Sequence, residues 1–321
     1  MEVNAEKFAT ISNEDELQEL LQKNKGKQIR ILGGGSNILL TENVSGLLIK
    51  NEIKGIRIIE EDEKTALVEV GGGENWHEFV CWTIEKNLGG IENLSLIPGT
   101  VGASPIQNIG AYGVELKDVF EELFITELST GIEYIFPKEE CQFGYRDSIF
   151  KREWKHKGCI TRVYFRLQKD PHEINISYGA IKNVLEEKGI KKPSIKDVSN
   201  VVIAIRQSKL PDPKIIGNCG SFFKNPEISA AEFQALQKRV GEVVHYPLPN
   251  GKFKIPAGWL IDQCGFKGVR YGNTGCYKNQ ALVLVNHGNA EGTEVKALAQ
   301  EIQAAVLEKF GLEIVPEVNI W

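Results

Sequence analysis

The segment IPGTVGASPIQNIGAYG, residues 97–113, constrains the fold more than any other part of the chain. It holds four glycines, two prolines and no charged residue in 17 residues, and it shows neither helical periodicity nor strand alternation. Surface loops are usually hydrophilic, whereas small residues allow a backbone to approach its neighbours closely. The segment is therefore predicted to be a loop packed tightly against another surface.

Two glycine runs precede this loop. Gly33–Gly35 follows the strand-like residues 28–32, and Gly71–Gly73 follows the strand-like residues 65–70 and precedes a helix through Trp76. A bare backbone after a strand can offer N–H donors to a phosphate, although a single glycine run is more often a turn. A G-x-G-x-x-G motif would need glycine where Ile38 and Trp76 stand, and no P-loop motif is present. Two runs together with residues 97–113 favour a large nucleotide cofactor outside the Rossmann class.

The remaining pattern is that of a chain mixing helices and strands. With 321 residues it is long enough for two or three domains. Ser12 and Asp15 read as a capping box, a helix is expected over 196–209, and the prolines at 211 and 213 mark a candidate boundary. Beyond them we expect a capped helix after Ser229, a strand over 281–286, a long helix ending at Gly311, and a final strand.

Charge and composition exclude several classes of protein. The net charge of -5 gives no support to a nucleic-acid or anionic-membrane partner. No apolar run approaches the roughly 18 residues that span a bilayer, and MEVNAEKFAT has no signal-peptide core, so we expect a cytoplasmic protein. The six cysteines form no C-x-x-C, and no histidine stands at zinc-ligand spacing, so no metal site is predicted.

Three residues are candidates for chemistry, each with a plain alternative. Arg146, behind a glycine in FGYRDS, either binds an anion or makes a surface contact with Asp147. Ser221, between a glycine and two phenylalanines, is either a hydroxyl acid in a closed pocket or part of a serine turn. Glu317 is either a buried carboxylate or faces solvent.

The motifs taken together resemble one enzyme family. They are GGGSN (33–37), GGENWHEFV (72–80), ENLSLIPGTVGASPIQNIGAYGVEL (92–116), FGYRDSIFK (143–151), KLPDPK (209–214), GSFFKNP (220–226), AGWLIDQCGFKG (257–268) and PEV (316–318). In this order they resemble the UDP-N-acetylenolpyruvoylglucosamine reductases, also called UDP-N-acetylmuramate dehydrogenases. One subgroup of this family carries an extra segment with a tyrosine loop, and Ser177-Tyr178-Gly179 resembles that loop.

The resemblance implies an α+β chain with an FAD-binding fold of the vanillyl-alcohol-oxidase (PCMH) type. Its two subdomains are expected at 1–60 and 61–208, the second joined by a C-terminal strand at 312–321, and a third α+β domain at 209–311 is expected to bind the substrate. The family usually carries an asparagine-threonine-phenylalanine stretch before its first strand, which is missing ahead of Glu2. We expect that the lack of this stretch, if it has an effect, weakens flavin retention or local stability.

The resemblance also implies the reaction and its residues. NADPH would reduce non-covalently bound FAD, and the flavin would reduce UDP-N-acetylglucosamine enolpyruvate to UDP-N-acetylmuramate for peptidoglycan synthesis. Arg146 matches the family arginine that stabilises the enolate, Ser221 matches the proton donor, and Glu317 matches its acidic partner. The protein is expected to act as a monomer on these small molecules.

Further contacts carry over from the family by position. Substrate contacts fall at Tyr178, Lys209, Asn225, Tyr246, Lys267 and Gln280. FAD contacts fall at Gly34, Gly35, Ser36 and Asn37, at Pro98, Gly99, Thr100, Val101, Gly102, Ala103 and Ser104, and at Ile109, Gly110, Ala111 and Tyr112. Lysines suit a diphosphate on an acidic protein, and an aromatic ring can stack on uracil.

Two other functions are compatible with parts of the pattern. A flavin oxidase acting on an alcohol would share the fold but would need neither the lysines nor Ser221. A non-catalytic flavin or nucleotide-sugar binding protein would not need Arg146, Ser221 and Glu317 together, and all three are present.

Overall fold

The computed structural model describes residues 2–321 and divides them into two compact units. Unit 1 comprises residues up to Asn4, Asn37–Asn43 and Gln207–Trp321, and unit 2 comprises Ala5–Ser36 and Val44–Arg206. Each unit has its own hydrophobic core, and each is described by itself below.

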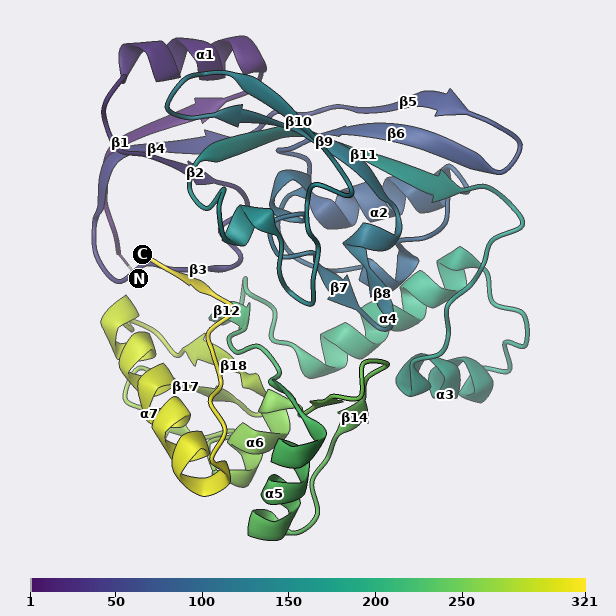
Figure 1. Ribbon diagram of the computed structural model, residues 1–321, viewed down its shortest axis with the longest axis vertical. Coiled ribbons are helices and arrows are strands. Elements are labelled where there is room, and N and C mark those ends of the chain that lie inside the picture. The colour runs from purple at the N-terminus through teal and green to yellow at the C-terminus, as the bar shows by residue number, and fades with distance from the viewer. Residues whose placement is uncertain (1) are drawn as a thin grey trace. The chain divides into compact units, whose positions relative to one another are not determined.

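Unit 2 begins with a small parallel sheet covered by a helix. The strands β1 (Ala5–Ile11), β2 (Ile29–Leu32) and β4 (Val44–Asn51) lie in the order β1-β4-β2. Helix α1 (Glu14–Lys23) lies over this sheet in Figure 1 and buries Leu17 and Leu21 in a cluster shared with β1 and β4. The N-cap of α1 is Asn13, one residue after the expected Ser12: its side chain accepts from the N–H of Glu16, and the Glu16 carboxylate accepts from the N–H of Ser12.

A five-stranded antiparallel sheet forms the larger part of unit 2. Its order is β10-β9-β11-β6-β5. The strands are β5 (Ile56–Glu61), β6 (Thr65–Gly71), β9 (Phe120–Glu127), β10 (Glu133–Pro137) and β11 (Gly158–Gln168). Helix α2 (Trp76–Glu85) lies on one face of this sheet (Figure 1), where Trp76, Phe79 and Phe165 pack with ring centroids 5.1 to 6.0 Å apart. A network of buried rings therefore fixes α2 to the sheet.

Short elements connect these layers. They are the 3-10 helices η1 (Glu92–Leu94), η2 (Val101–Ala103), η3 (Leu116–Asp118) and η4 (Ile149–Lys151) and the paired strands β7 (Gly110–Ala111) and β8 (Val114–Glu115). Helices α3 (Gly179–Glu187) and α4 (Ile195–Lys209) follow, and their apolar faces share one cluster that includes Ile181, Leu185 and Val202. The helix expected over 196–209 is thereby confirmed to within one residue.

Unit 1 is a second α+β structure with a four-stranded sheet, β12-β18-β17-β16. Its sheet strands are β12 (Gly217–Ser221), β16 (Arg270–Tyr271), β17 (Thr274–Tyr277) and β18 (Gln280–Asn286), and its helices are α5 (Ala230–Val240), α6 (Ala257–Gln263) and α7 (Gly292–Phe310). A smaller sheet, β13-β15-β14, is formed by β13 (Glu227–Ile228), β14 (Tyr246–Pro247) and β15 (Phe253–Lys254). The expected capping box of α5 and the left-handed Gly311 after α7 are both present.

The C-terminal strand lies in a different place from the one expected. We expected residues 312–321 to join the part of the chain at 61–208, whereas β19 (Asn319–Ile320) pairs in parallel with β3 (Ile38–Leu39). Thr41 completes this pairing, because its N–H and hydroxyl both donate to the carbonyl of Trp321. Residues 37–43 and the C-terminus thereby belong to unit 1.

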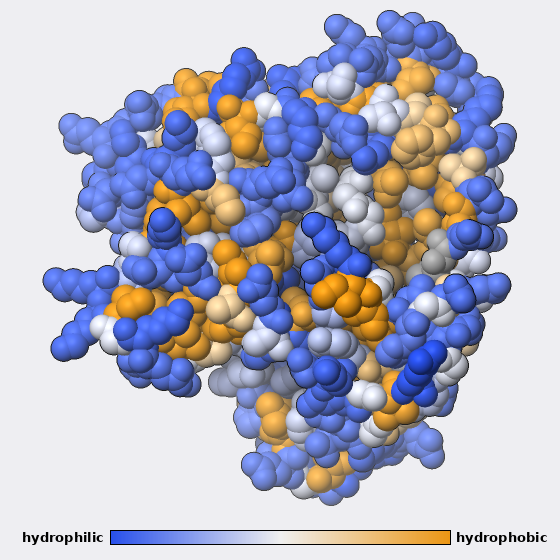
Figure 2. All heavy atoms as spheres, turned by 180° about the vertical axis from the view of Figure 1, so that it is seen from behind, coloured by the Kyte–Doolittle hydropathy of each residue, from blue (hydrophilic) through white to orange (hydrophobic). Residues whose placement is uncertain are grey.

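Apolar residues are concentrated in the cores. Figure 2 shows one face of the molecule, on which hydrophilic side chains predominate and apolar ones form small separate groups. Within residues 2–321, no helix combines the length and the apolar character that crossing a membrane requires.

Candidate active site

The glycine runs and the loop 97–113 meet backbone against backbone in unit 2. A Cβ placed on Gly33 would lie 2.6 Å from the hydroxyl of Thr100, and one on Gly34 would lie 3.1 Å from Cα of Gly99. The N–H of Gly102 donates to the carbonyl of Gly72 at 2.8 Å, and a Cβ on Gly102 would lie 2.9 Å from the same carbonyl oxygen. Tight packing of the uncharged loop is therefore confirmed, and glycine suits these positions because a Cβ there would crowd the facing segment.

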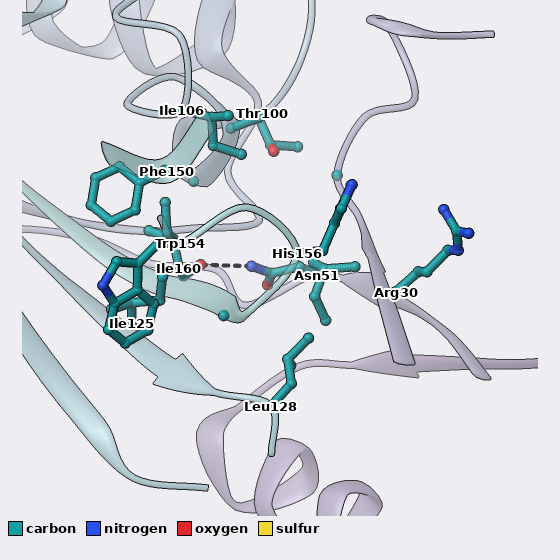
Figure 3. A pocket seen from close by; sticks show the side chains of 15 residues that line it. Arg30, Asn51, Thr100, Ile106, Ile125, Leu128, Phe150, Trp154, His156 and Ile160 are labelled. Atoms are coloured by element: carbon teal, nitrogen blue, oxygen red, sulfur yellow. Dashed lines mark hydrogen bonds between the residues drawn. The ribbon is translucent and has the colours of Figure 1, made fainter. Parts of the chain in front are cut away.

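A cavity of about 120 Å³ opens beside this contact. Its wall includes Gly33, Thr100, Gly102 and Ala103. The other lining residues are Arg30, Ile31, Asn51, Ile106, Ile125, Leu128, Phe150, Trp154, His156, Gly158 and Ile160. Figure 3 shows Phe150, Trp154 and Ile125 on one side of the cavity and Arg30 on the other. The cavity thus has an apolar, aromatic side and a cationic side.

Two polar residues at the cavity have defined states. Asn51 is buried, and its amide donates to the carbonyl of Ile160 at 2.9 Å while its oxygen accepts from the N–H of Ile53. Burial lowers the pKa of His156, and the positive charges of Lys155 and Arg30 lower it further. His156 is therefore neutral near pH 7, so Arg30 supplies the fixed positive charge of the lining.

Arg146 lies beside the segment predicted to contact the flavin. Its backbone is left-handed, with φ of 49°, and its guanidinium donates to the carbonyl of Gly110 and lies 5.3 Å from the centroid of the Tyr145 ring. Arg152 forms the ion pair with Asp147. Arg146 is thus directed toward the loop that contains Gly110.

Tyr112, Tyr178 and Arg206 form a second group in unit 2. The rings of Tyr112 and Tyr178 meet edge to face with centroids 5.2 Å apart, and Tyr178 stands immediately before α3. Arg206 hydrogen-bonds the hydroxyl of Tyr112, and its Nε donates to the carbonyl of Leu96 at 3.2 Å. Burial lowers the pKa of Arg206, and the nearby charge of Arg146 adds to that effect. Burial also raises the pKa of the Tyr112 hydroxyl, which therefore stays protonated.

Ser221 and Glu317 lie on neighbouring segments of unit 1. Ser221 is exposed at the end of β12, opposite Val283 of β18, and is followed by the buried Phe222 and Phe223. The N–H of Glu317 donates to the carbonyl of Phe222 at 2.8 Å. Glu317 is half-buried, and the amide of Asn37 approaches its carbonyl at 3.4 Å. The two residues expected to handle the proton are therefore brought to adjacent segments of the chain.

Some of the predicted substrate contacts in unit 1 lie around α6. Asn225 accepts from the N–H of Ala257 at 2.8 Å, and the side-chain oxygen of Gln280 lies 2.9 Å from the position of a Cβ on Gly258. Lys267, which follows α6, forms an ion pair at 3.0 Å with Asp262 of that helix. Lys209 and Tyr246 are exposed, at the end of α4 and on the edge strand β14.

Comparison with known proteins decides the family. Residues 212–321 match the model of the C-terminal domain of UDP-N-acetylenolpyruvoylglucosamine reductase, and residues 5–130 match an FAD binding domain. The reductase of Flavobacterium johnsoniae is 50% identical over 320 residues, covering 100% of this chain and 95% of the relative. This chain belongs to the UDP-N-acetylenolpyruvoylglucosamine reductase family. The reductase of Pseudomonas aeruginosa, 46% identical over 323 residues with the same two coverages, agrees.

Structural comparison confirms the expected fold of this reductase-family member. The structure of UDP-N-acetylenolpyruvylglucosamine reductase (MurB) from Thermus caldophilus matches with a TM-score of 0.68 at 24% identity, over 97% of this chain and 91% of that one. The 6-hydroxy-D-nicotine oxidase of Arthrobacter nicotinovorans matches with a TM-score of 0.53 at 12% identity, over 98% and 82%. Two FAD-binding subdomains of the vanillyl-alcohol-oxidase type and a third α+β domain are therefore present. The chain is a flavoprotein of the oxidoreductase class.

Several residues of this reductase-family site were missed in the sequence. Asn51 and Trp154 line the cavity but lie outside the quoted motifs, and Phe150 lies in FGYRDSIFK without having been singled out. Arg206 lies in a helix whose apolar pattern was recognised, but the pattern carries no sign of its Tyr112 contact. No role was assigned to His77 from the sequence, and the structure shows it half-buried, with its ring accepting a hydrogen bond from the N–H of Leu96. Among residues 2–321 no cluster of His, Cys, Asp and Glu has metal-ligand geometry.

Proposed function

We propose that this chain is an NADPH-dependent flavoenzyme that reduces UDP-N-acetylglucosamine enolpyruvate to UDP-N-acetylmuramate. The observation that carries the proposal is the cavity beside Thr100, Gly102 and Ala103, all predicted FAD contacts, in a member of this reductase family. We propose further that the protein acts in the cytoplasm as a monomer on small molecules, with no nucleic-acid or membrane partner. The division into 1–60, 61–208 and 209–311 and the Tyr178-loop subgroup belong to the same proposal.

The residues present fit non-covalent FAD. Gly33, Gly34 and Gly102 leave no room for side chains and expose backbone to a ligand. The aromatic side chains of Phe150 and Trp154 would hold a flat apolar ring system, and Arg30 would face the anionic diphosphate. The predicted contacts Gly34–Ser36, Pro98–Ser104 and Ile109–Tyr112 all belong to unit 2, and Asn37 belongs to unit 1.

The chemistry requires a fixed cation and a proton donor from the chain. FAD, when bound, supplies a carrier that takes a hydride from NADPH and gives it to the methylene carbon of the enolpyruvyl group. Negative charge then develops on the α-carbon and its carboxylate, and the permanently charged guanidinium of Arg146 would stabilise it. The hydroxyl of Ser221 would donate a proton to the α-carbon. Glu317, on the segment next to the one that holds Ser221, would polarise this hydroxyl or help to deliver the proton.

The substrate contacts have separate tasks in this proposal. Lys209 and Lys267 would bind the diphosphate, and Tyr246 would stack on the uracil. Asn225 and Gln280, which both lie near the first residues of α6, would orient the sugar by hydrogen bonds. Tyr178, half-exposed at the start of α3, would contact the substrate from unit 2.

The test follows the flavin spectrum through both half-reactions. Anaerobic NADPH should bleach the yellow band of the purified protein, and UDP-N-acetylglucosamine enolpyruvate should restore it. Ser221→Ala should leave bleaching nearly intact and slow the recovery by at least about a hundredfold, the low end for a lost general acid. Ser221→Cys keeps a proton donor at the same position and should recover faster than the alanine variant.

Two results would contradict the proposal. Bleaching without recovery in the unaltered protein would indicate a different oxidising substrate. Equal slowing of both half-reactions in Ser221→Ala would remove Ser221 from the role of proton donor.

A further inference from the structure

Leu96 has a backbone conformation that its side chain disfavours. Its φ is 58°, in the left-handed region where a Cβ crowds the following carbonyl. It stands between η1 and the segment Ile97–Ser104, which contains the longest continuous run of predicted FAD contacts. A leucine keeps such a conformation only when neighbouring groups impose it. The groups that hold Leu96 therefore also set the course of the chain into Ile97–Ser104.

Side chains from α2 and α4 hold both peptide groups of Leu96. The N–H of Leu96 donates to Nδ1 of His77 at 3.0 Å, and its carbonyl accepts from Nε of Arg206 at 3.2 Å. The preceding residues are fixed as well, because Trp76 Nε1 donates to the carbonyl of Leu94 and the hydroxyls of Ser95 and Ser199 lie 2.8 Å apart.

The contact with His77 depends on the protonation of its ring. Nδ1 can accept the N–H of Leu96 only while it carries no proton, so the imidazole must be neutral with its hydrogen on Nε2. Protonation of Nδ1 would place its N–H against the N–H of Leu96, so that two donors would face each other and the hydrogen bond would be lost. Burial lowers the pKa of His77, the charge of Arg206 on α4 lowers it further, and Glu78 on α2 raises it. Cys81, one turn along α2, adds a thiol 3.8 to 3.9 Å from the ring nitrogens.

We propose that His77 is a positioning residue for the cofactor: through the N–H of Leu96, its neutral imidazole holds Ile97–Ser104 in the conformation that receives FAD. This inference rests on the proposed flavin function. His77 is not required to touch FAD, because its bonded partner is the backbone of Leu96. Acidification should therefore weaken FAD binding when His77 becomes protonated.

The test compares two substitutions in the full chain, stripped of FAD and titrated with it from pH 5 to pH 8. His77→Leu removes the acceptor and should weaken FAD binding about tenfold at pH 8, the equivalent of one net hydrogen bond. His77→Asn keeps a neutral oxygen near the position of Nδ1 and should stay within about threefold of the unaltered protein. Affinity should fall on acidification in the unaltered protein and much less in both variants. His287→Leu, which removes an exposed histidine of unit 1, should keep the full pH dependence.

A second readout needs no cofactor. Hydrogen exchange of the Leu96 amide in the FAD-free protein should be faster in His77→Leu than in His77→Asn, and faster at pH 5 than expected from the intrinsic rate. The inference is overturned if asparagine behaves as leucine does in both measurements, or if the pH dependence of FAD affinity survives in His77→Leu. If the unaltered protein binds no FAD at any pH, the proposed function fails, and unchanged exchange of the Leu96 amide would by itself overturn the role of His77.

Discussion

Five residues around the candidate site hold left-handed backbone conformations although none is glycine. They are Leu96, Asn108, Tyr112, Arg146 and His156, with φ between 44° and 62°. All of them except His156 are held by hydrogen bonds: the buried side chain of Asn108, for example, donates to the carbonyl of Gly144 and accepts from the N–H of Lys117. Such conformations cost about 1–3 kcal/mol each and persist where surrounding contacts impose them, as they do at binding sites. Stability is thus exchanged here for a defined arrangement of the loops.

Glu69 gives a residue-scale prediction about stability and pH. This carboxylate is 9% exposed in β6 and accepts hydrogen bonds from Tyr164 and Arg57. Burial raises its pKa, but those hydrogen bonds and the Arg57 charge outweigh burial, so the net shift is downward from 4.5. Glu69→Gln should lower the free energy of unfolding by about 1–3 kcal/mol at pH 7, because a buried charged hydrogen bond is lost.

The pH dependence of that difference has a definite sign. A lowered folded-state pKa favours the folded state fully above the unfolded pKa, and the contribution disappears as the pH falls through the folded pKa. Urea unfolding should therefore show the largest difference between Glu69→Gln and the unaltered protein at pH 5 to 7, and a smaller one below pH 4. Glu60→Gln, at an exposed position on β5, should change stability by less than about 0.5 kcal/mol. If the difference in stability between Glu69→Gln and the unaltered protein grew on acidification, the lowered pKa of Glu69 would be contradicted.

Candidate site residues that stand in a local motif were predicted from the sequence. Residues whose place in the site depends on distant contacts were not. Ser221 stands in GSFFKNP and Arg146 in FGYRDS, so both were identified by position in a motif. The role of His77 depends on Leu96, 19 residues further along, and on a left-handed turn that no leucine signals. The periodicity of a helix gives no information about the hydrogen-bond partner of such a residue.

At the scale of elements, the first residue of α7 gives a prediction. Gly292 is buried, and a Cβ on it would lie 1.8 Å from the carbonyl oxygen of Leu40 and 2.9 Å from Cα of Thr41. Gly292→Ala should therefore destabilise the protein by about 1–3 kcal/mol, as overpacking of a rigid contact does. Thermal unfolding of the purified variants measures the effect.

Gly179 provides the matched control. It is likewise the first residue of a helix, α3, but nothing lies within 4 Å of a Cβ placed on it. Gly179→Ala should leave stability unchanged or raise it by about 0.4–1 kcal/mol, because it reduces the freedom of the unfolded chain. Similar effects of the two substitutions would show that backbone contact at Gly292 is not the cause.

Elements with strong local signals were predicted well. The N-cap of α5, the glycine after α7 and the apolar runs of β6 and β18 predicted those boundaries to within one or two residues. Strand β1 was missed, because Glu6 and Lys7 interrupt its pattern and its stability comes from parallel pairing with β4, some 40 residues away. A final strand was expected, but its partner was not, because the two residues of β19 pair with Ile38 and Leu39, far away in the sequence. Long-range pairing of short strands leaves little trace in the local sequence.

For the whole molecule, the predicted site residues divide between the two units according to chemistry. Arg146, Tyr178 and all predicted FAD contacts except Asn37 belong to unit 2. Ser221, Glu317 and the other predicted substrate contacts belong to unit 1. Only the resemblance to a family predicted that residues of both units serve one reaction, because composition and periodicity describe each unit separately.

This division predicts that the two ligands protect different parts of the chain from hydrogen exchange. FAD added to the FAD-free protein should slow exchange mainly in residues 33–36 and 97–113 of unit 2, since ligand binding suppresses local opening. UDP-N-acetylmuramate added to the FAD-loaded protein should slow exchange mainly near Lys209, Tyr246 and Lys267 of unit 1. GDP-mannose, a nucleotide sugar with a different base, should change neither pattern. Protection by FAD confined to unit 1, or protection by the UDP-sugar confined to unit 2, would contradict the assignment of cofactor and substrate contacts, because each ligand can stabilise only the backbone that it contacts or orders.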